Sequence, residues 1–242
     1  MTAAFGSPRH HYAHTDSTNA RARALAALGA PSGTVVTAAE QSAGRGRRGR
    51  AWSAPAGRAL LYTAILRSLA ERHALLPLAV PLAVADAIEA LAPVECELKW
   101  PNDVWIERRK AAGILLESRP PEWALIGIGL NVSIDQDEFP SELRWPATSV
   151  GHGATVEGAV EALNDRLARW VGAEREEVLA AFRRRDGLVG RSLRWEGAAD
   201  DAPEGAGTAA GIDDDGNLLV ETADGRVSLG SGEVQLTPDG DS

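Results

Sequence analysis

Residues 96–131 read CELKWPNDVWIERRKAAGILLESRPPEWALIGIGLN, and this stretch decides the fold class. It holds four short β-like runs, at residues 97–100, 104–106, 112–116 and 124–130, separated by Asn-Asp, Arg-Lys and Pro-Pro pairs. Short apolar runs bounded by turn-forming residues are typical of strands. The stretch therefore predicts neighbouring strands of one sheet.

Helical patterns flank these strands on both sides. An Ala/Leu-rich run over residues 17–29 ends at a glycine, as capped helices often do. Apolar residues recur at helical spacing in residues 73–91 and again in residues 156–185. Two further strands are predicted at residues 34–38 and 59–66. The predicted class is α/β (α+β), a mixed β-sheet with helices on one face.

The composition changes after Gly187 to short β-like pieces between Asp/Gly turns. We therefore predict a main domain over residues 1–186 and a small β-domain over residues 187–242. The Ala-, Asp-, Glu- and Gly-rich residues 196–207 are predicted as a loop within that second domain.

The charge balance limits the classes of ligand. The 242 residues include 25 Lys and Arg against 34 Asp and Glu, a net charge of −9, which disfavours general binding to nucleic acid or acidic membranes. The single cysteine, Cys96, excludes an internal disulfide, and it is interpreted as a small buried residue. No signal-peptide pattern and no uncharged membrane-spanning run is found in the sequence. A cytoplasmic protein is expected.

One basic loop stands out against this acidic background. Residues 44–50 contain four arginines and three glycines, so backbone and guanidinium groups can both approach an anion. The glycines satisfy the dinucleotide pattern G-x-G-x-x-G, but Trp52 to Pro55 cannot continue the helix that such a motif opens. The loop is expected to bind phosphate or carboxylate, with a solvated or nucleic-acid-binding Arg/Gly segment as the alternative.

Several other polar residues lie at predicted strand ends. Lys99, Asn102 and Asp103 share one turn, and Lys110 stands at the entrance to a strand. Gly127 and Gly129 alternate along the last strand before Asn131, which opens space beside the backbone. Taken singly, the Pro-Asn-Asp residues fit an ordinary turn and the glycines fit a bulge about as well as a ligand site. Lys110 by itself is more typical of a solvated lysine. Neither the histidines nor Cys96 show metal-ligand spacing, so no metal site on the protein is predicted.

In combination, these motifs resemble the biotin protein ligase family. The resemblance rests on residues 16–19, 40–41, 44–52, 99–103, 109–115 and 127–131, and it covers roughly residues 14–135. The C-terminal β-domain looks like the SH3-like barrel of that family. The chain reaches its Ser-Thr-Asn motif by Ser17, so it looks like the form without an N-terminal DNA-binding domain.

The resemblance implies a two-step reaction. ATP with Mg²⁺ would activate biotin to biotinoyl-5′-adenylate, and the acyl group would pass to a lysine of a biotin carboxyl carrier domain. That carrier domain, from a biotin-dependent carboxylase, is the implied partner. No DNA or membrane binding is expected, and a homodimer is left open.

The resemblance also assigns roles to residues. Biotin would be bound by Ser17, Thr18, Asn19, Gln41, Arg45, Gly46, Arg47, Lys110, Gly113, Gly127 and Gly129. ATP or the adenylate would be bound by Arg45, Arg47, Arg50, Trp52, Lys99, Asn102 and Asn131. The implied catalytic residues are Lys110, Arg45 and Asp103. Lys110 would bridge carboxylate and phosphate, Trp52 would face adenine, and Asp103 would orient or deprotonate the carrier lysine.

Two alternatives remain open from the sequence. A lipoyl or octanoyl ligase or transferase shares the architecture and also acylates a carrier lysine, although the Arg/Gly loop argues against it. A non-catalytic nucleotide- or nucleic-acid-binding regulator would use the same loop as its contact surface. The net charge counts against that second alternative.

Overall fold

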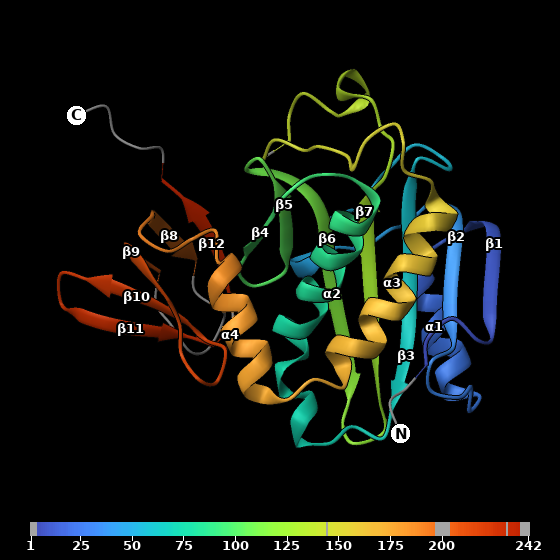
Figure 1. Ribbon diagram of the computed structural model, residues 1–242, viewed down its shortest axis with the longest axis horizontal. Helices are drawn as coiled ribbons and strands as arrows, with labels where there is room; N and C mark the ends of the chain where they lie inside the picture. The colour runs from blue at the N-terminus through green and yellow to red at the C-terminus, as the bar shows by residue number, and fades with distance from the viewer. Residues whose placement is uncertain (1–3, 144, 197–203, 231, 238–242) are drawn as a thin grey trace.

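A computed structural model describes residues 4–143, 145–196, 204–230 and 232–237 of the chain. Two β-sheets account for its strands, and helix α4 (Arg175–Arg185) lies between them (Figure 1). The larger sheet and its helices form the first 185 or so residues, and the smaller sheet follows. The domain boundary at residues 186 and 187 stays a prediction, because buried residues of both sheets belong to one continuous hydrophobic cluster.

The larger sheet has seven strands in the order β1-β2-β3-β7-β6-β5-β4. Their bounds are β1 Arg9–Thr15, β2 Val35–Gln41, β3 Ala59–Arg67, β4 Cys96–Lys99, β5 Asp103–Ile106, β6 Arg109–Arg119 and β7 Trp123–Asn131. β1 and β2 pair in parallel and the other neighbours pair antiparallel, so the predicted mixed sheet is confirmed. The four strands predicted between residues 96 and 131 lie together in it, as β4 to β7.

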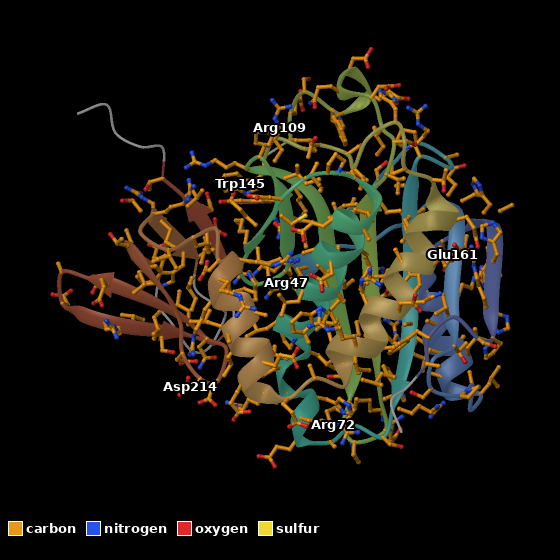
Figure 2. The ribbon with its side chains drawn as sticks, in the orientation of Figure 1. Arg47, Arg72, Arg109, Trp145, Glu161 and Asp214 are labelled. Atoms are coloured by element: carbon orange, nitrogen blue, oxygen red, sulfur yellow. The ribbon has the colours of Figure 1, made fainter. Side chains whose placement is uncertain are left out.

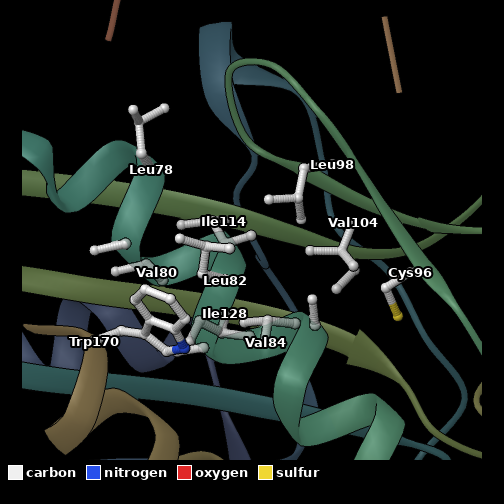
Figure 3. Close-up of a cluster of buried hydrophobic side chains, with 14 of the residues drawn as sticks. Leu78, Val80, Leu82, Val84, Cys96, Leu98, Val104, Ile114, Ile128 and Trp170 are labelled. Carbon is white, nitrogen blue, oxygen red and sulfur yellow. The ribbon is translucent and has the colours of Figure 1, made fainter. Parts of the chain in front are cut away.

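Three helices cover one face of this sheet. α2 (Leu76–Leu91), α3 (Val156–Val171) and α4 follow the predicted helical segments, and the 3-10 turn η2 (Glu71–Leu75) leads into α2. α2 is apolar on nearly every side because it lies between the sheet and α3. Figure 3 shows Leu82 and Val84 of α2 beside Ile114 and Ile128 of the sheet and Trp170 of α3.

α1 (Thr18–Ala27) lies on the opposite face. Ala22 and Ala26 pack against Val36, Ile65 and Leu125 in a separate small cluster. The helices are therefore not confined to one face. The alternation of side chains along β7 explains this division, since Ile126 and Ile128 face α2 and α3 while Leu125 and the two glycines face the side of α1.

The segment Glu71–Leu91 is long and apolar enough to cross a membrane by length and composition. It contains the charged residues Glu71, Arg72, Asp86 and Glu89, so it differs from the uncharged run that the sequence lacks. Most of this segment is buried against the sheet and α3, which is the environment of a core helix.

The smaller sheet is antiparallel, with strands in the order β11-β10-β9-β8-β12. Its strands are β8 Ser192–Glu196, β9 Gly205–Ile212, β10 Leu218–Thr222, β11 Gly225–Leu229 and β12 Glu233–Leu236. Within the described ranges no pairing joins β11 to β12, so the closed barrel that the resemblance implied is not observed.

The predicted loop over residues 196–207 is partly wrong. Glu196 belongs to β8 and residues 205–207 begin β9, while residues 197–203 lie outside the described part of the chain. The glycines and alanines at the start of β9 are not typical of a strand, so the sequence did not predict it. The structure nevertheless requires small residues at these positions. A Cβ at Gly205 would overlap the Trp195 ring, and one at Gly207 would overlap the carbonyl of Glu221 on β10.

Candidate active site

A cavity of about 430 Å³ lies over the face of the larger sheet that α1 shares. The first turn of α1, the arginine loop and the middle of β6 and β7 border it, and residues 139–143 with Trp145 complete the wall. Of the residues assigned to biotin or nucleotide from the sequence, the structure brings all but Lys99 to this cavity. Asp103 is also outside the lining but contacts a lining residue.

One end of the cavity is neutral and polar. Ser17 is the N-cap of α1, although its hydroxyl makes no capping hydrogen bond. Gln41, at the end of β2, takes that part: its Oε1 accepts from the Thr18 backbone N–H at 2.7 Å and lies 3.0 Å from the Thr18 hydroxyl. This leaves the Gln41 amide nitrogen turned toward Gly44, the first glycine of the arginine loop.

The arginine loop is a tight reversal of the chain. The Gly46 N–H donates to the carbonyl of Arg50 at 2.7 Å, and the Trp52 N–H donates to that of Gly44 at 3.0 Å. Arg48 and Gly49, in the 3-10 turn η1 (Arg47–Gly49), have φ of 54° and 73°. Glycine relieves the steric cost of such a turn. The result is that Arg45, Arg47 and Arg50 all line one cavity.

The buried carboxylate of Asp103 forms an ion pair with Lys110. Asp103 begins β5, and its Oδ1 lies 2.6 Å from Lys110 Nζ on β6. Its other oxygen is 3.9 Å from Lys99 Nζ, and both Lys99 and Asp103 are almost completely buried. Lys99 also lies near the faces of the Trp105 and Trp145 rings. The turn predicted from Lys99 to Asp103 therefore places a carboxylate between two ammonium groups.

The strand glycines make room for protein side chains. A Cβ at Gly129 would overlap the Trp52 indole, and one at Gly113 would approach Trp52 Cζ3 to 3.1 Å. The Lys110 ammonium lies 5.7 Å from the centre of the same ring. Trp52 thus packs on Gly113 and Gly129 of the sheet, next to the Lys110 ammonium. Gly127 similarly accommodates the side chain of Asn19.

The two asparagines hold neighbouring backbone. Asn102 Nδ2 donates to the carbonyl of Ile114 at 3.0 Å, and Arg47 Nη1 approaches Asn102 Oδ1 at 3.5 Å. Asn131 Nδ2 donates to the carbonyl of Thr148 at 3.0 Å, which fixes the end of the loop that passes Lys110. Both asparagines also line the cavity, so their structural and ligand-facing roles coexist.

Sequence reasoning missed part of the wall. The aliphatic residues Leu61 and Leu115 were assigned only to strands, although each lies opposite a glycine of β7 and alternation could have placed both on the glycine face. The loop with Phe139, Leu143 and Trp145 was not singled out at all. Trp145 stacks at a tilt against Trp105, 5.9 Å between ring centres, near the ends of β5 and β6 (Figure 2). Aromatic residues in an otherwise polar loop were the available signal.

The electrostatics favour an anionic ligand. Arg45, Arg47, Arg50 and Lys110 border the cavity, against Glu142 as the acidic lining residue. No group of three His, Cys, Asp or Glu that could hold a metal ion occurs in the described residues. Cys96 is buried beneath α2, away from this cavity, and burial raises the pKa of its thiol to about 12. That agrees with its interpretation as a packing residue.

Comparison with known proteins identifies the family to which the chain is similar. Residues 12–135 match the Biotin/lipoate A/B protein ligase family, and residues 204–237 match the Biotin protein ligase C terminal domain. A biotin–[acetyl-CoA-carboxylase] ligase of Paracoccus denitrificans is 37% identical over 92% of this chain and 98% of its own length. The bifunctional ligase/repressor BirA of Bacillus spizizenii is 34% identical over 91% of this chain and 71% of its own.

A solved structure extends the comparison to the fold. Biotin protein ligase from Aquifex aeolicus, in complex with biotin and ATP, superposes with a TM-score of 0.79 at 27% identity. The match covers 96% of this chain and 99% of that one, including the C-terminal sheet. The fold and the cationic cavity thus define a member of the biotin and lipoate ligase class. Within that class, the chain belongs to the biotin protein ligase family.

Proposed function

We propose that this protein is a biotin protein ligase that activates biotin with ATP and transfers it to a lysine of a biotin carboxyl carrier domain. The observation that carries the proposal is one cavity with neutral polar side chains at the first turn of α1, its polar end, and with Arg45, Arg47, Arg50 and Lys110 at its cationic end. Trp52 packs on the sheet beside Lys110. A ligand with a hydrogen-bonding head, an apolar body and a carboxylate matches this lining. The family's C-terminal domain favours biotin over lipoate.

The polar end suits the ring of biotin. Ser17, Thr18, Asn19 and Gln41 offer donors and acceptors on rigid elements, and Gly127 and Gly129 let Asn19 and Trp52 approach the sheet. The Trp52 indole then packs against the apolar body of biotin. This role differs from the adenine contact expected from the sequence, because the ring lies on Gly113 and Gly129.

At the cationic end the biotin carboxylate meets ATP. Arg45, Arg47 and Lys110 reduce the repulsion between carboxylate and α-phosphate in a partly dry site. A carboxylate oxygen attacks the α-phosphorus and the bond to the pyrophosphate oxygen breaks, so biotinoyl-adenylate and pyrophosphate form. Arg50, Lys99, Asn102 and Asn131 are assigned to the nucleotide side, Lys99 acting through Asp103.

Magnesium fits this site as a companion of ATP. The described residues form no cage of three metal ligands, and magnesium commonly binds through substrate phosphates with few protein ligands. Carried in with ATP, it would neutralise phosphate charge there. In the second step the amine of the carrier lysine attacks the acyl carbon, and the C–O bond between the acyl carbon and AMP breaks. The amine also loses a proton. Asp103, the buried carboxylate beside Lys110, is proposed to accept it.

The test is product analysis by mass spectrometry. Purified protein is incubated with Mg²⁺, ATP and either biotin or lipoate, and biotinoyl-adenylate is expected from biotin alone. Lys110→Ala should lower its formation by about 100-fold or more, as loss of one charge-stabilising group at a reacting centre does. Arg109→Ala, adjacent on β6 and exposed, is the matched control and should retain activity.

Each other result has a clear meaning. A lipoyl product would keep the fold and change the substrate, and the absence of any adenylate would favour a binding protein.

A cytoplasmic location is proposed from the core position of the apolar helix and from the carrier substrate.

A further inference from the structure

Glu117 lies just outside the cavity and has no part in the chemistry above. It is on β6, four residues beyond Gly113, and its Oε1 accepts a hydrogen bond from Asn19 Nδ2 at 2.8 Å. Its second oxygen forms an ion pair with Arg23, one turn further along α1. A single carboxylate thus bridges the sheet to the helix that carries the polar end of the cavity.

The carboxylate determines which way the Asn19 amide faces. An ionised carboxylate can only accept hydrogen bonds, so the NH₂ group of Asn19 must be turned toward Glu117. Burial opposes ionisation of Glu117, but the hydrogen bonds from Asn19 and Arg23 and the charge of Arg45 outweigh it and lower the pKa. The Asn19 oxygen then faces Thr63, a fully buried residue whose hydroxyl donates to it across 2.6 Å.

This orientation reaches the ligand because Asn19 lines the cavity. The amide has two N–H groups and two lone pairs, and Glu117 and Thr63 engage one of each. Among the described residues, this leaves one donor and one acceptor of the amide for a ligand. If the amide turned by 180°, donor and acceptor would exchange places and a ligand matched to the first arrangement would be mismatched to the second.

We propose that Glu117 is a positioning residue that fixes the Asn19 amide and so sets the donor and acceptor pattern by which the polar end selects its ligand. This inference rests on the proposed function, which makes that ligand a cyclic urea bearing both N–H and C=O groups. Glu117 acts through Asn19 and does not contact the reacting atoms, so it governs recognition of biotin and not the attack on phosphorus.

Steady-state kinetics of adenylate formation can separate these roles. Glu117→Ala frees the amide to turn, and the KM for biotin is expected to rise by about 10-fold, the size of effect typical for one mismatched buried polar group. The kcat and the KM for ATP should stay within about two-fold, because the cationic end is unchanged. The matched control is Arg23→Ala, which removes the other partner of Glu117, keeps the Asn19 contact, and should leave the KM for biotin near the parent value.

A double-mutant cycle with Asn19→Ala decides between positioning and general support of the fold. If Glu117 acts through Asn19, Glu117→Ala has no further effect on the KM for biotin once Asn19 is alanine. Equal effects in both backgrounds would overturn the inference, as would an unchanged KM in the single variant. Glu117→Met, which keeps the length of the side chain but removes the acceptor oxygen, serves the same cycle if the alanine variant does not fold. A parent protein inactive with biotin would overturn the proposed function as well, so the two failures are distinguishable.

Discussion

At the scale of single residues, Asp103 is proposed to act in both adenylate formation and transfer to the carrier lysine. Its carboxylate holds Lys110 at 2.6 Å and is also the proposed partner of the carrier lysine. Asp103→Asn should therefore slow both adenylate formation and transfer. The transfer step is measured alone by supplying preformed biotinoyl-adenylate with a carrier domain, and its rate should fall by about 10- to 100-fold. A normal transfer rate would restrict Asp103 to orienting Lys110.

The residues that the sequence identified share a property that explains why they were found. Arg45, Arg47 and Lys110 are charged side chains at turns and strand entrances, where a structural role alone gives little reason for them. Leu61 and Leu115 were missed because an aliphatic residue facing a cavity has the same sequence pattern as one facing the core. Glu117 was missed because its partners Asn19 and Arg23 are almost 100 residues away in the chain.

At the scale of elements, the arginine loop is where ligand binding should change the structure most. Gly44 to Gly57 carries like charges that repel one another until an anion is bound. Backbone amides of the loop should therefore exchange hydrogen more slowly when Mg²⁺, ATP and biotin are all present. Hydrogen exchange read by mass spectrometry tests this, with α3 as the internal control, since α3 packs against α2 away from the cavity. Equal exchange with and without ligand would show that the loop is already fixed.

The elements that the sequence did not predict are those whose hydrogen bonding depends on distant partners. β1 is polar, with three histidines, and it is a strand because its backbone pairs with β2 along one edge of the sheet. β9 is rich in glycine and alanine because Trp195 and the backbone of β10 leave no room for larger side chains. The strands β4 to β7 were predictable because their apolar runs are buried on a sheet and interrupted by clear turn residues.

At the scale of the whole molecule, Asp186 lies where the chain passes from the larger sheet to the smaller one. It makes a backbone bridge with Leu98 of β4, and its Oδ1 accepts from the Leu188 N–H at 2.9 Å. Its Oδ2 is buried, and no hydrogen-bond partner for it occurs among the described residues. Burial raises the pKa of this carboxyl to about 6. Between about pH 4 and pH 6, the Asp186 carboxyl is therefore protonated in the native state but ionised in the unfolded state, where its pKa is about 3.9.

The sign of the pH dependence follows from this difference. Because the native state binds more protons in that range, stability rises as the pH falls from about 6 to 4, and above pH 6 the ionised carboxylate costs about 2–3 kcal/mol. Asp186→Asn keeps the bond to Leu188 and removes the charge, so it should raise Tm at pH 7.5 by roughly 5–10 °C. Most of that gain should disappear at pH 4.5, where the parent carboxyl is already protonated. Thermal unfolding of parent and variant at both pH values measures the effect, and Asp165→Asn on the exposed side of α3 is the control. A gain of equal size at both pH values would mean that packing, and not the charge, distinguishes the variant.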